Sequence, residues 1–239
     1  MLGPQDPRQN HLLAALPADD FERVFPNLKL VTMPLGQVLS DPGLPMRYVY
    51  FPTTAIVSRL YELEDGSSSE IAVVGNEGIV GISLFMGGEL SYRRCVVESA
   101  GHAYRMQGQV LKNEFHRTEA MRHLLLSYTQ ALLTQMAQTA VCNRYHSVDQ
   151  QLCRWLLLRL DRLASNELSV TQDLIATMLG VRREGITEAA GNLQRTGLIE
   201  YRRGHITVLD RAGLEARVCE CYAVVKKEFD RLLPETIVP

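Results

Sequence analysis

The order of apolar and polar positions divides the chain into a β-rich front part and a helical back part. Up to Met106, short segments rich in β-branched and aromatic residues alternate with turn formers such as Asp-Pro-Gly at 41–43 and Gly-Gly at 87–88. Short strands at such spacing are typical of a sandwich or a barrel. The predicted strands are Tyr48–Phe51, Ala55–Leu63, Glu70–Val74, Cys95–Ser99 and His102–Met106.

A long helix is predicted next, over about 112–144. The chain contains neither proline nor glycine from Lys112 to Arg144, and its apolar residues recur at helical spacing. One stripe steps by alternating fours and threes, as the contact positions of a two-stranded coiled coil do. This expected dimer interface consists of Met121, Leu125, Tyr128, Leu132, Gln135 and Thr139. The alternative is a helix lying on its own sheet, but the stripe extends beyond what a small barrel could cover.

A new helix is predicted after Ser147, a residue suited to cap its N-terminus. Its apolar face would consist of Leu152, Trp155, Leu156, Leu160 and Leu163. The change between the two helices places the domain boundary at Tyr145–His146. We therefore expect a first domain over 1–145 and a second over 146–239.

The stretch "TQDLIATMLGVRREGIT" at 171–187 fits two short helices joined by a tight turn. Thr171 can cap the first helix, Ala176 is small enough for close helix contact, and Gly180 allows a left-handed turn. The second helix would bury Ile186, and would end near Thr196-Gly197. A helix–glycine–helix pair alone is common in enzymes as well as in DNA-binding proteins.

Two alternating strands follow this pair, and they favour DNA binding over the enzyme interpretation. The segments "LIEYR" and "HITVL" meet at Arg203-Gly204, which predicts a β-hairpin wing whose tip is placed to touch phosphates. The predicted DNA contacts are Thr171, Gln172, Arg182, Arg183, Glu184, Thr187, Glu188, Arg202, Arg203 and His205.

Composition and charge limit the choice of partners. The chain of 239 residues is 46% hydrophobic and 22% charged, with a net charge of −2. Global charge therefore favours no particular partner, but Val181–His205 contains five arginines and three glutamates. The chain has no apolar run long enough for a membrane span and does not begin like a secretory signal, so we expect a cytoplasmic protein without membrane contact.

The arrangement of an N-terminal roll, a long helix and a winged helix-turn-helix resembles the CRP/FNR family of bacterial transcription regulators. The resemblance is most specific in "TQDLIATMLGVRREGITEAAGNLQRTGLI" and the wing. It implies an α+β protein with a double-stranded, jelly-roll-like β-roll, a long dimerisation helix and a C-terminal winged helix-turn-helix. It also implies a homodimer on a palindromic operator in double-stranded DNA, RNA polymerase as partner if the protein is an activator, and a small-molecule effector that the sequence does not name.

The resemblance assigns base recognition to Arg183-Glu184, which match the family's Arg-Glu pair. Arginine can bond bidentately to guanine, and glutamate accepts from cytosine. Relatives carry a second arginine four residues after the glutamate, where this chain has Glu188. An acidic residue there repels phosphate, so we expect a different half-site.

In relatives that bind cyclic nucleotides, a Gly-Glu pair binds the ribose, and an arginine followed by a hydroxyl residue binds the phosphate. The corresponding residues here are Gly81, Ile82, Arg93 and Arg94. Isoleucine cannot accept a hydrogen bond from a ribose hydroxyl, and neither arginine precedes Ser or Thr. Ordinary cyclic AMP is therefore not the expected effector, and Arg93-Arg94 can equally be a solvated turn.

The five cysteines are odd in number and have no disulfide-framework spacing. Cys219 and Cys221 form a Cys-x-Cys pair, which cannot by itself supply four zinc ligands. Cys142 and His146, four residues apart, could hold a metal or simply form a local pair. We expect no metal and no other cofactor, with a redox- or metal-responsive regulator acting through cysteine as the alternative.

An enzyme is the alternative from another class. A β-roll can hold a metal as cupin-type oxygenases do, but such a site needs several histidines on the strands, and only His102 lies in the predicted β region. No nucleophile elbow, phosphate loop or HExxH motif is present. We expect no catalytic residues and no enzymatic activity.

Overall fold

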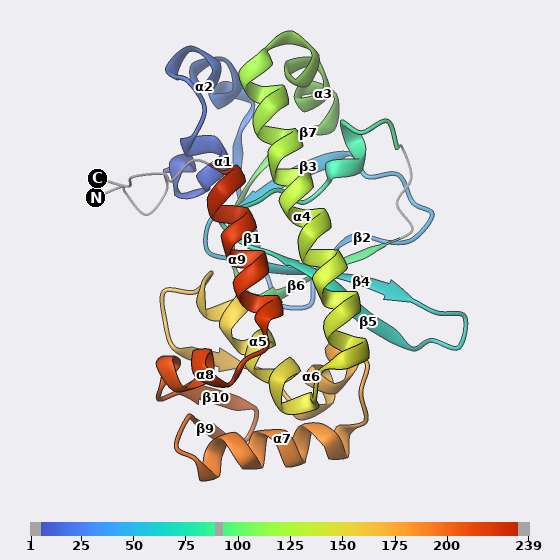
Figure 1. The fold of residues 1–239 in the computed structure, drawn as a ribbon. Helices are drawn as coiled ribbons and strands as arrows, with labels where there is room; N and C mark the ends of the chain where they lie inside the picture. The colour runs from blue at the N-terminus through green and yellow to red at the C-terminus, as the bar shows by residue number, and fades with distance from the viewer. Residues whose placement is uncertain (1–5, 89–92, 234–239) are drawn as a thin grey trace. The chain divides into compact units, whose positions relative to one another are not determined.

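The structure, a computed structural model, describes residues 6–88 and 93–233 (Figure 1). The chain divides into two compact units, each of which is discontinuous in sequence. The first unit consists of Met1–Arg59, Val73–Leu133 and Glu228–Pro239, and the second unit consists of Leu60–Ala72 and Thr134–Lys227.

The strands of the front part form two sheets. The three-stranded sheet has the order β1-β7-β3, with β1 Lys29–Met33 and β3 Tyr48–Pro52 both antiparallel to β7 Gly101–Gln107. The four-stranded sheet has the order β2-β6-β4-β5, formed by β2 Val38–Ser40, β6 Arg94–Ser99, β4 Ile56–Glu62 and β5 Ser68–Val74. The chain crosses between the sheets from β1 to β2, from β3 to β4 and from β6 to β7, as in a jelly-roll-like roll, and the predicted fold class is confirmed.

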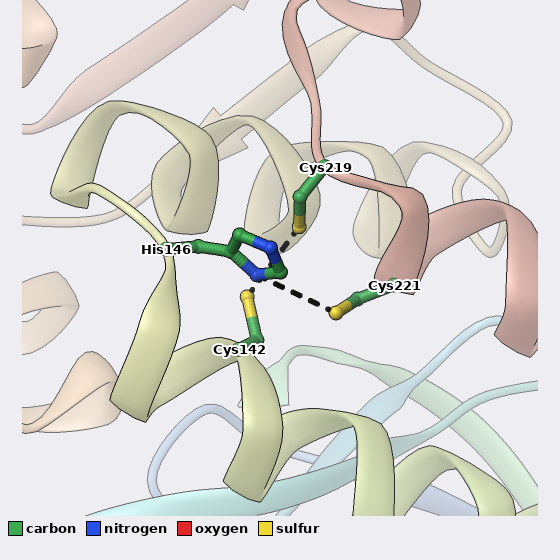
Figure 2. A group of neighbouring side chains, drawn as sticks. All are labelled: Cys142, His146, Cys219 and Cys221. Carbon is green, nitrogen blue, oxygen red and sulfur yellow. Dashed lines mark hydrogen bonds between the residues drawn. The ribbon is translucent and has the colours of Figure 1, made fainter.

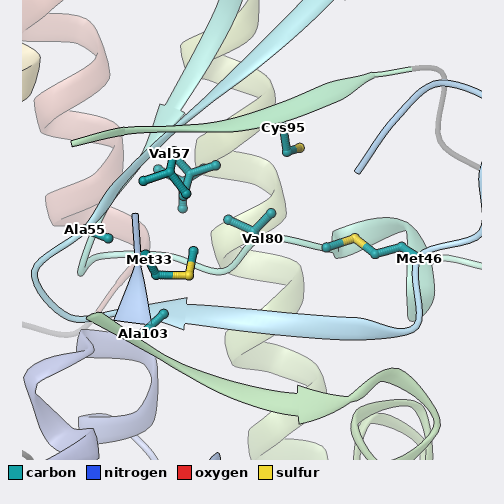
Figure 3. Close-up of a cluster of buried hydrophobic side chains, with 9 residues drawn as sticks. Met33, Met46, Ala55, Val57, Val80, Cys95 and Ala103 are labelled. Atoms are coloured by element: carbon teal, nitrogen blue, oxygen red, sulfur yellow. The ribbon is translucent and has the colours of Figure 1, made fainter. Parts of the chain in front are cut away.

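The interior between these strands is apolar (Figure 3). Met33 of β1, Val57 of β4, Cys95 of β6 and Ala103 of β7 are all buried in one cluster. Each of these four strands thus contributes an inward side chain to a common core. Strands β1 and β2 were not predicted, because β1 has no clean alternation of burial and β2 is only three residues long.

Short helical segments precede and interrupt the strands. They are η1 Pro7–Gln9, α1 His11–Ala14, α2 Ala18–Val24, η2 Phe25–Asn27 and η3 Ile82–Leu84. Asn10 caps α1 by accepting hydrogen bonds from two backbone N–H groups, while its side-chain amide donates to Pro52 O and Gly78 O at 2.9 and 2.8 Å. This buried amide joins three separate segments of the first unit.

The predicted helix over 112–144 is two helices, which corrects its N-terminal boundary. Helix α3 spans Gly108–Arg117 and α4 spans Glu119–Tyr145, with Thr118 between them in an extended conformation. The Thr118 hydroxyl accepts from Met121 N at 3.4 Å, while Thr118 N still donates to Glu114 O. A threonine that satisfies the first amides of a new helix can thus end the previous one without proline or glycine.

The side chains of α4 that we expected to form the dimer interface are buried within the chain itself, so they offer little surface to a second copy. In the first unit, the Tyr128 hydroxyl donates to Ile79 O at 3.4 Å, and its ring meets the edge of Phe229. Gly78 permits this contact, since a Cβ there would lie 2.4 Å from the Tyr128 oxygen. The six expected residues, Met121, Leu125, Tyr128, Leu132, Gln135 and Thr139, all have buried side chains.

The second unit continues from the end of α4 through helices and a small antiparallel sheet. Ser147 and Gln150 form the expected cap at the start of α5, each accepting a hydrogen bond from the other's backbone N–H. The sheet has the order β8-β10-β9. The elements are α5 Val148–Leu160, β8 Glu167–Ser169, α6 Gln172–Leu179, α7 Arg183–Arg195, β9 Ile199–Arg202, β10 His205–Val208, α8 Arg211–Arg217 and α9 Glu220–Leu232.

The outer end of the β4–β5 hairpin also belongs to the second unit. Glu70 of β5 forms a buried ion pair with Arg159 of α5 at 2.5 Å, and the Ser69 hydroxyl donates to Met178 O of α6 at 3.4 Å. The single boundary expected at Tyr145–His146 therefore differs from this division, because the hairpin contributes to the packing of a unit that lies mostly beyond residue 133. No described helix is both long and apolar enough to cross a membrane.

Candidate nucleic-acid interface

Helices α6 and α7 form the predicted helix-turn-helix. The Thr171 hydroxyl accepts from Leu174 N at 3.2 Å and caps α6, and Gly180 ends it in the left-handed conformation with φ 66°. Val181 N then donates to Ala176 O, which closes the turn. Ile175 and Ile186 are fully buried, so the two helices are held together by an apolar contact.

The start of α7 presents a polar face to solvent. The residues predicted to read DNA there, Arg182, Arg183, Glu184, Thr187 and Glu188, are all exposed. Arg182 occupies the N-cap position without a side-chain hydrogen bond to the helix. None of the five belongs to the apolar core, so their side chains are accessible to a ligand.

The structure brings the first turns of α6 and α7 together through polar contacts. The Thr187 hydroxyl donates to Gln172 Oε1 at 2.8 Å, and Arg183 Nε lies 3.3 Å from Asp173 Oδ1. The side chains of Arg183 and Asp173 are 63% and 68% exposed, so the ion pair contributes at most about 1 kcal/mol. Such a weak contact can orient the Arg183 side chain, and it can break when the guanidinium binds a ligand.

Asp173 was missed by the sequence analysis. Its position in the first turn of α6 indicated only favourable helix electrostatics. No sequence signal indicated this contact, because it depends on how the two helices cross. Asp173 adds a negative charge beside Arg183, so the exposed face carries both signs.

The wing has the predicted hairpin geometry. Arg203 and Gly204 at its tip have φ values of 47° and 83°, the left-handed pair that a two-residue hairpin turn requires. Arg203 is exposed, and Arg202 forms an exposed ion pair with Glu200 at 2.6 Å. The His205 ring lies 3.1 Å from the Ser169 hydroxyl of β8.

Strand β8, which the sequence did not predict, pairs with β10 and, together with Val170 directly after it, supports the wing. Val170 N donates to Gly204 O at 2.7 Å, and the Tyr201 hydroxyl donates to Val170 O at 3.2 Å. Burial raises the pKa of Tyr201, so this hydroxyl remains a donor at neutral pH. These two hydrogen bonds therefore hold the wing tip in place.

The four candidate ligand residues of the roll have different environments. Gly81 adopts φ 112°, and a Cβ there would lie 3.0 Å from Val49 Cγ1, while Ile82 is buried. Arg94 pairs with Asp41 at 3.4 Å, and Arg93 is partly exposed. Gly81 thus packs closely against the apolar interior, whereas the two arginines are at least partly accessible. His102 is exposed on β7.

Sequence and structure comparisons agree on the class of protein. Residues 150–217 match the Crp-like helix-turn-helix domain family. No curated protein sequence matches the chain. Among solved structures, FixK2 from Bradyrhizobium japonicum superimposes with a TM-score of 0.69 at 16% identity, over 80% of this chain and 98% of that protein.

Two further structures show the same likeness. A protein from Eubacterium rectale, described as a transcriptional regulator of the CRP/FNR family, has a TM-score of 0.69 at 18% identity, over 87% of this chain and 98% of its own. CLP from Xanthomonas campestris, described as a c-di-GMP-responsive global regulator, has a TM-score of 0.63 at 18% identity, over 81% and 100%. Residues 150–217 therefore match the Crp-like helix-turn-helix domain, and the chain has the fold seen in CRP/FNR transcription regulators.

Proposed function

We propose that the chain is a homodimeric regulator that reads a palindromic operator through α7 and responds to a small molecule in its β-roll. The observation that carries this proposal is the exposed start of α7 on a fully buried helix-turn-helix core, with a supported wing beside it. Buried residues fix the position of the helix, while five polar residues remain available for DNA.

Arg183 and Glu184 are proposed to read one G·C base pair. Arg183 would donate two hydrogen bonds to guanine, and Glu184 would accept one from cytosine. Glu188 lies one turn further along the same exposed face and would favour a cytosine or adenine amino group, since a carboxylate can only accept. Thr187 and Gln172, already joined by a hydrogen bond, would contact the backbone or a base edge together.

The wing and the helix caps are proposed to bind phosphates. Arg202, Arg203 and His205 are exposed at or beside the hairpin tip, and Arg182 and Thr171 precede the two helices. Contacts of this kind position a protein on the duplex without reading sequence.

A second copy of the chain is the proposed partner along α4, through a different stripe from the one expected. Leu126, Leu133 and Val141 are 47%, 49% and 44% exposed on this helix. With the exposed residues Gln130 and Ala137 they form one stripe, whose members are spaced by four, three, four and four residues. Pairing two copies along this stripe would cover the apolar side chains and relate two α7 helices by two-fold symmetry.

The effector is proposed to act through the β4–β5 hairpin. Strand β4 begins in the first unit and ends in the second, where Glu70 and Ser69 contact α5 and α6. The proposed ligand would bind near Arg93 and Arg94, and Gly81 and Ile82 would complete its site. It would change the arrangement of the two units only if it bound one arrangement more tightly than the other. If the regulator is an activator, RNA polymerase is a further partner.

The base-reading assignment is tested with Arg183→Ala. The wild-type protein should retain a small subset of genomic fragments. In the variant, the preference for the right base pair at one position of the retained site should fall by about 5- to 150-fold. Binding of each singly substituted duplex measures this preference. Equal weakening on every duplex, with no base pair affected more than the others, would overturn the assignment.

A further inference from the structure

Four side chains that are far apart in sequence converge at the end of α4 (Figure 2). Cys142 and His146 lie one turn apart at the end of this helix, and Cys219 and Cys221 lie at the start of α9. Their ligand atoms all lie within 4.8 Å of one another. All four residues belong to the second unit.

The separations fit ligands that share one metal ion. Cys142 Sγ lies 3.6 Å from Cys219 Sγ, and Cys221 Sγ lies 3.6 Å from His146 Nδ1. In a tetrahedral zinc site, bond lengths of about 2.3 Å to sulfur and 2.0 Å to nitrogen put neighbouring ligand atoms about 3.5–3.8 Å apart. The side chains therefore need little movement to accept an ion.

The same compactness argues against an iron–sulfur cluster. In a cubane cluster each ligand binds a different iron, so the ligand atoms stand further apart than ligands of a single ion. A greatest separation of 4.8 Å leaves room for one ion among the four atoms.

His146 is oriented as a metal ligand usually is. Its Nδ1 faces Cys221, and its Nε2 lies 3.4 Å from Glu220 Oε2. A carboxylate that accepts from the distal ring N–H fixes the tautomer in which the other nitrogen has a free lone pair. Gln151 further holds the end of α4 by donating to His146 O at 3.0 Å.

A buried cation next to the cluster matches the charge of the proposed site. Three thiolates and one divalent ion sum to a net charge of −1. Arg154 is 4% exposed, and among the described residues its guanidinium bonds only to the Thr139 hydroxyl, at 3.3 Å. Arg154 lies close enough to Cys142 and Cys221 to interact with their sulfurs electrostatically. A buried arginine without a carboxylate is costly, and an anionic site beside it would offset that cost.

We propose that Cys142, His146, Cys219 and Cys221 bind one Zn²⁺ ion that ties the start of α9 to the end of α4. All four positions are supplied by the protein, and the three cysteines are at most 3% exposed. Closed, fully protein-ligated sites are structural rather than catalytic. Each thiol loses its proton on binding, so loading one ion releases the protons that the three sulfurs carry beforehand.

A disulfide is the competing use of these cysteines. The Cys142 and Cys219 sulfurs are 3.6 Å apart, well beyond the ~2.05 Å of a bond. A disulfide would involve only two of the four side chains and would not explain why His146, Glu220 and Cys221 lie beside them. Four convergent ligands favour the metal.

The test is metal analysis of the full-length protein purified in a reducing buffer, followed by chelation and titration with Co²⁺. We expect one zinc per chain, and saturation at one Co²⁺ per chain with the intense visible bands of tetrahedral cobalt and a thiolate charge-transfer band. Cys219→Ala should lose both the zinc and these bands. Cys95→Ala, which removes a buried cysteine of the roll, should keep them.

The wild-type protein alone can overturn the proposal, whether or not a variant folds. Failure to take up Zn²⁺ or Co²⁺ after chelation, a cobalt spectrum without tetrahedral or thiolate bands, or acid-labile sulfide bound with iron would each contradict it. A lower melting temperature after chelation, restored by one equivalent of Zn²⁺, would support it. These readouts do not depend on DNA binding.

Discussion

Arg183 carries the base recognition that we propose, and its surroundings leave the guanidinium available. The exposed contact with Asp173 at 3.3 Å can hold the side chain in place in the free protein at little cost. Binding a guanine would replace this contact by two hydrogen bonds in a less hydrated groove. The arginine was predictable from the motif, whereas Asp173 became relevant only through the crossing of the two helices.

Arg203 should contribute affinity without specificity. It lies at the wing tip with φ 47°, so asparagine, which tolerates this conformation, is a better replacement than alanine. Arg203→Asn should weaken binding to all duplexes alike and reduce the slope of log K against log salt by about 0.9 for one lost phosphate contact. Titrations at several salt concentrations measure this slope.

Arg117 provides the matched control for this prediction, because its exposed side chain lies on α3 in the first unit. Arg117→Asn should leave the slope unchanged. An Arg203→Asn variant with the wild-type slope, or with a loss confined to one sequence, would show that the wing tip does not bind phosphate.

At the scale of elements, helical periodicity predicted α4 but not the side that faces solvent. The stripe through Tyr128 and the stripe through Leu133 both follow heptad-like spacing, and only packing against Ile79 and Phe229 distinguishes them. Both partners come from segments far from α4 in sequence. The pattern of a single helix cannot reveal which neighbour covers which face.

The exposed stripe makes a prediction about assembly. Leu133→Glu places a charge where two copies of α4 would meet, so the variant should be monomeric at concentrations at which the wild type is a dimer. Sedimentation velocity measures the two states. Leu209→Glu, at an exposed leucine outside α4, should remain dimeric. A wild type that is monomeric at all accessible concentrations would refute the interface.

The ion pair between Glu70 and Arg159 should stabilise the attachment of the β4–β5 hairpin to the second unit. Arg159 is 1% exposed, lies over the Trp155 ring at 3.8 Å, and is 89 residues away from Glu70 in sequence. Glu70→Gln should lower the free energy of unfolding by about 3–5 kcal/mol, because a buried cation loses its carboxylate. Urea unfolding measures the change.

The double variant Glu70→Leu/Arg159→Met should recover much of this loss, because apolar residues of similar size require no paired charge. If Glu70→Gln lowered the free energy of unfolding by less than about 0.5 kcal/mol, the ion pair would be no stronger than an exposed one, and the prediction would be contradicted. Because the two residues are far apart in sequence, their pairing could not be predicted from local patterns.

For the whole molecule, the order of elements predicted the class of fold, and contacts between distant segments determined the rest. Five roll strands, the helix-turn-helix and the wing followed from local patterns and turn residues. The discontinuous units, the buried face of α4 and the convergence of Cys142 and His146 with Cys219 and Cys221 did not. Each of these depends on residues that approach only after the chain has folded.

Selection of random duplex DNA by the purified protein, without added ligand and then with cell extract, tests the central claim most directly. A two-fold symmetric dimer with exposed α7 helices should recover an inverted repeat whose half-sites lie about one helical turn, ~34 Å, apart. If the repeat were recovered only with extract, the roll would have to bind its effector before the protein binds DNA. Recovery of no common sequence under either condition would contradict the account of an operator-reading regulator.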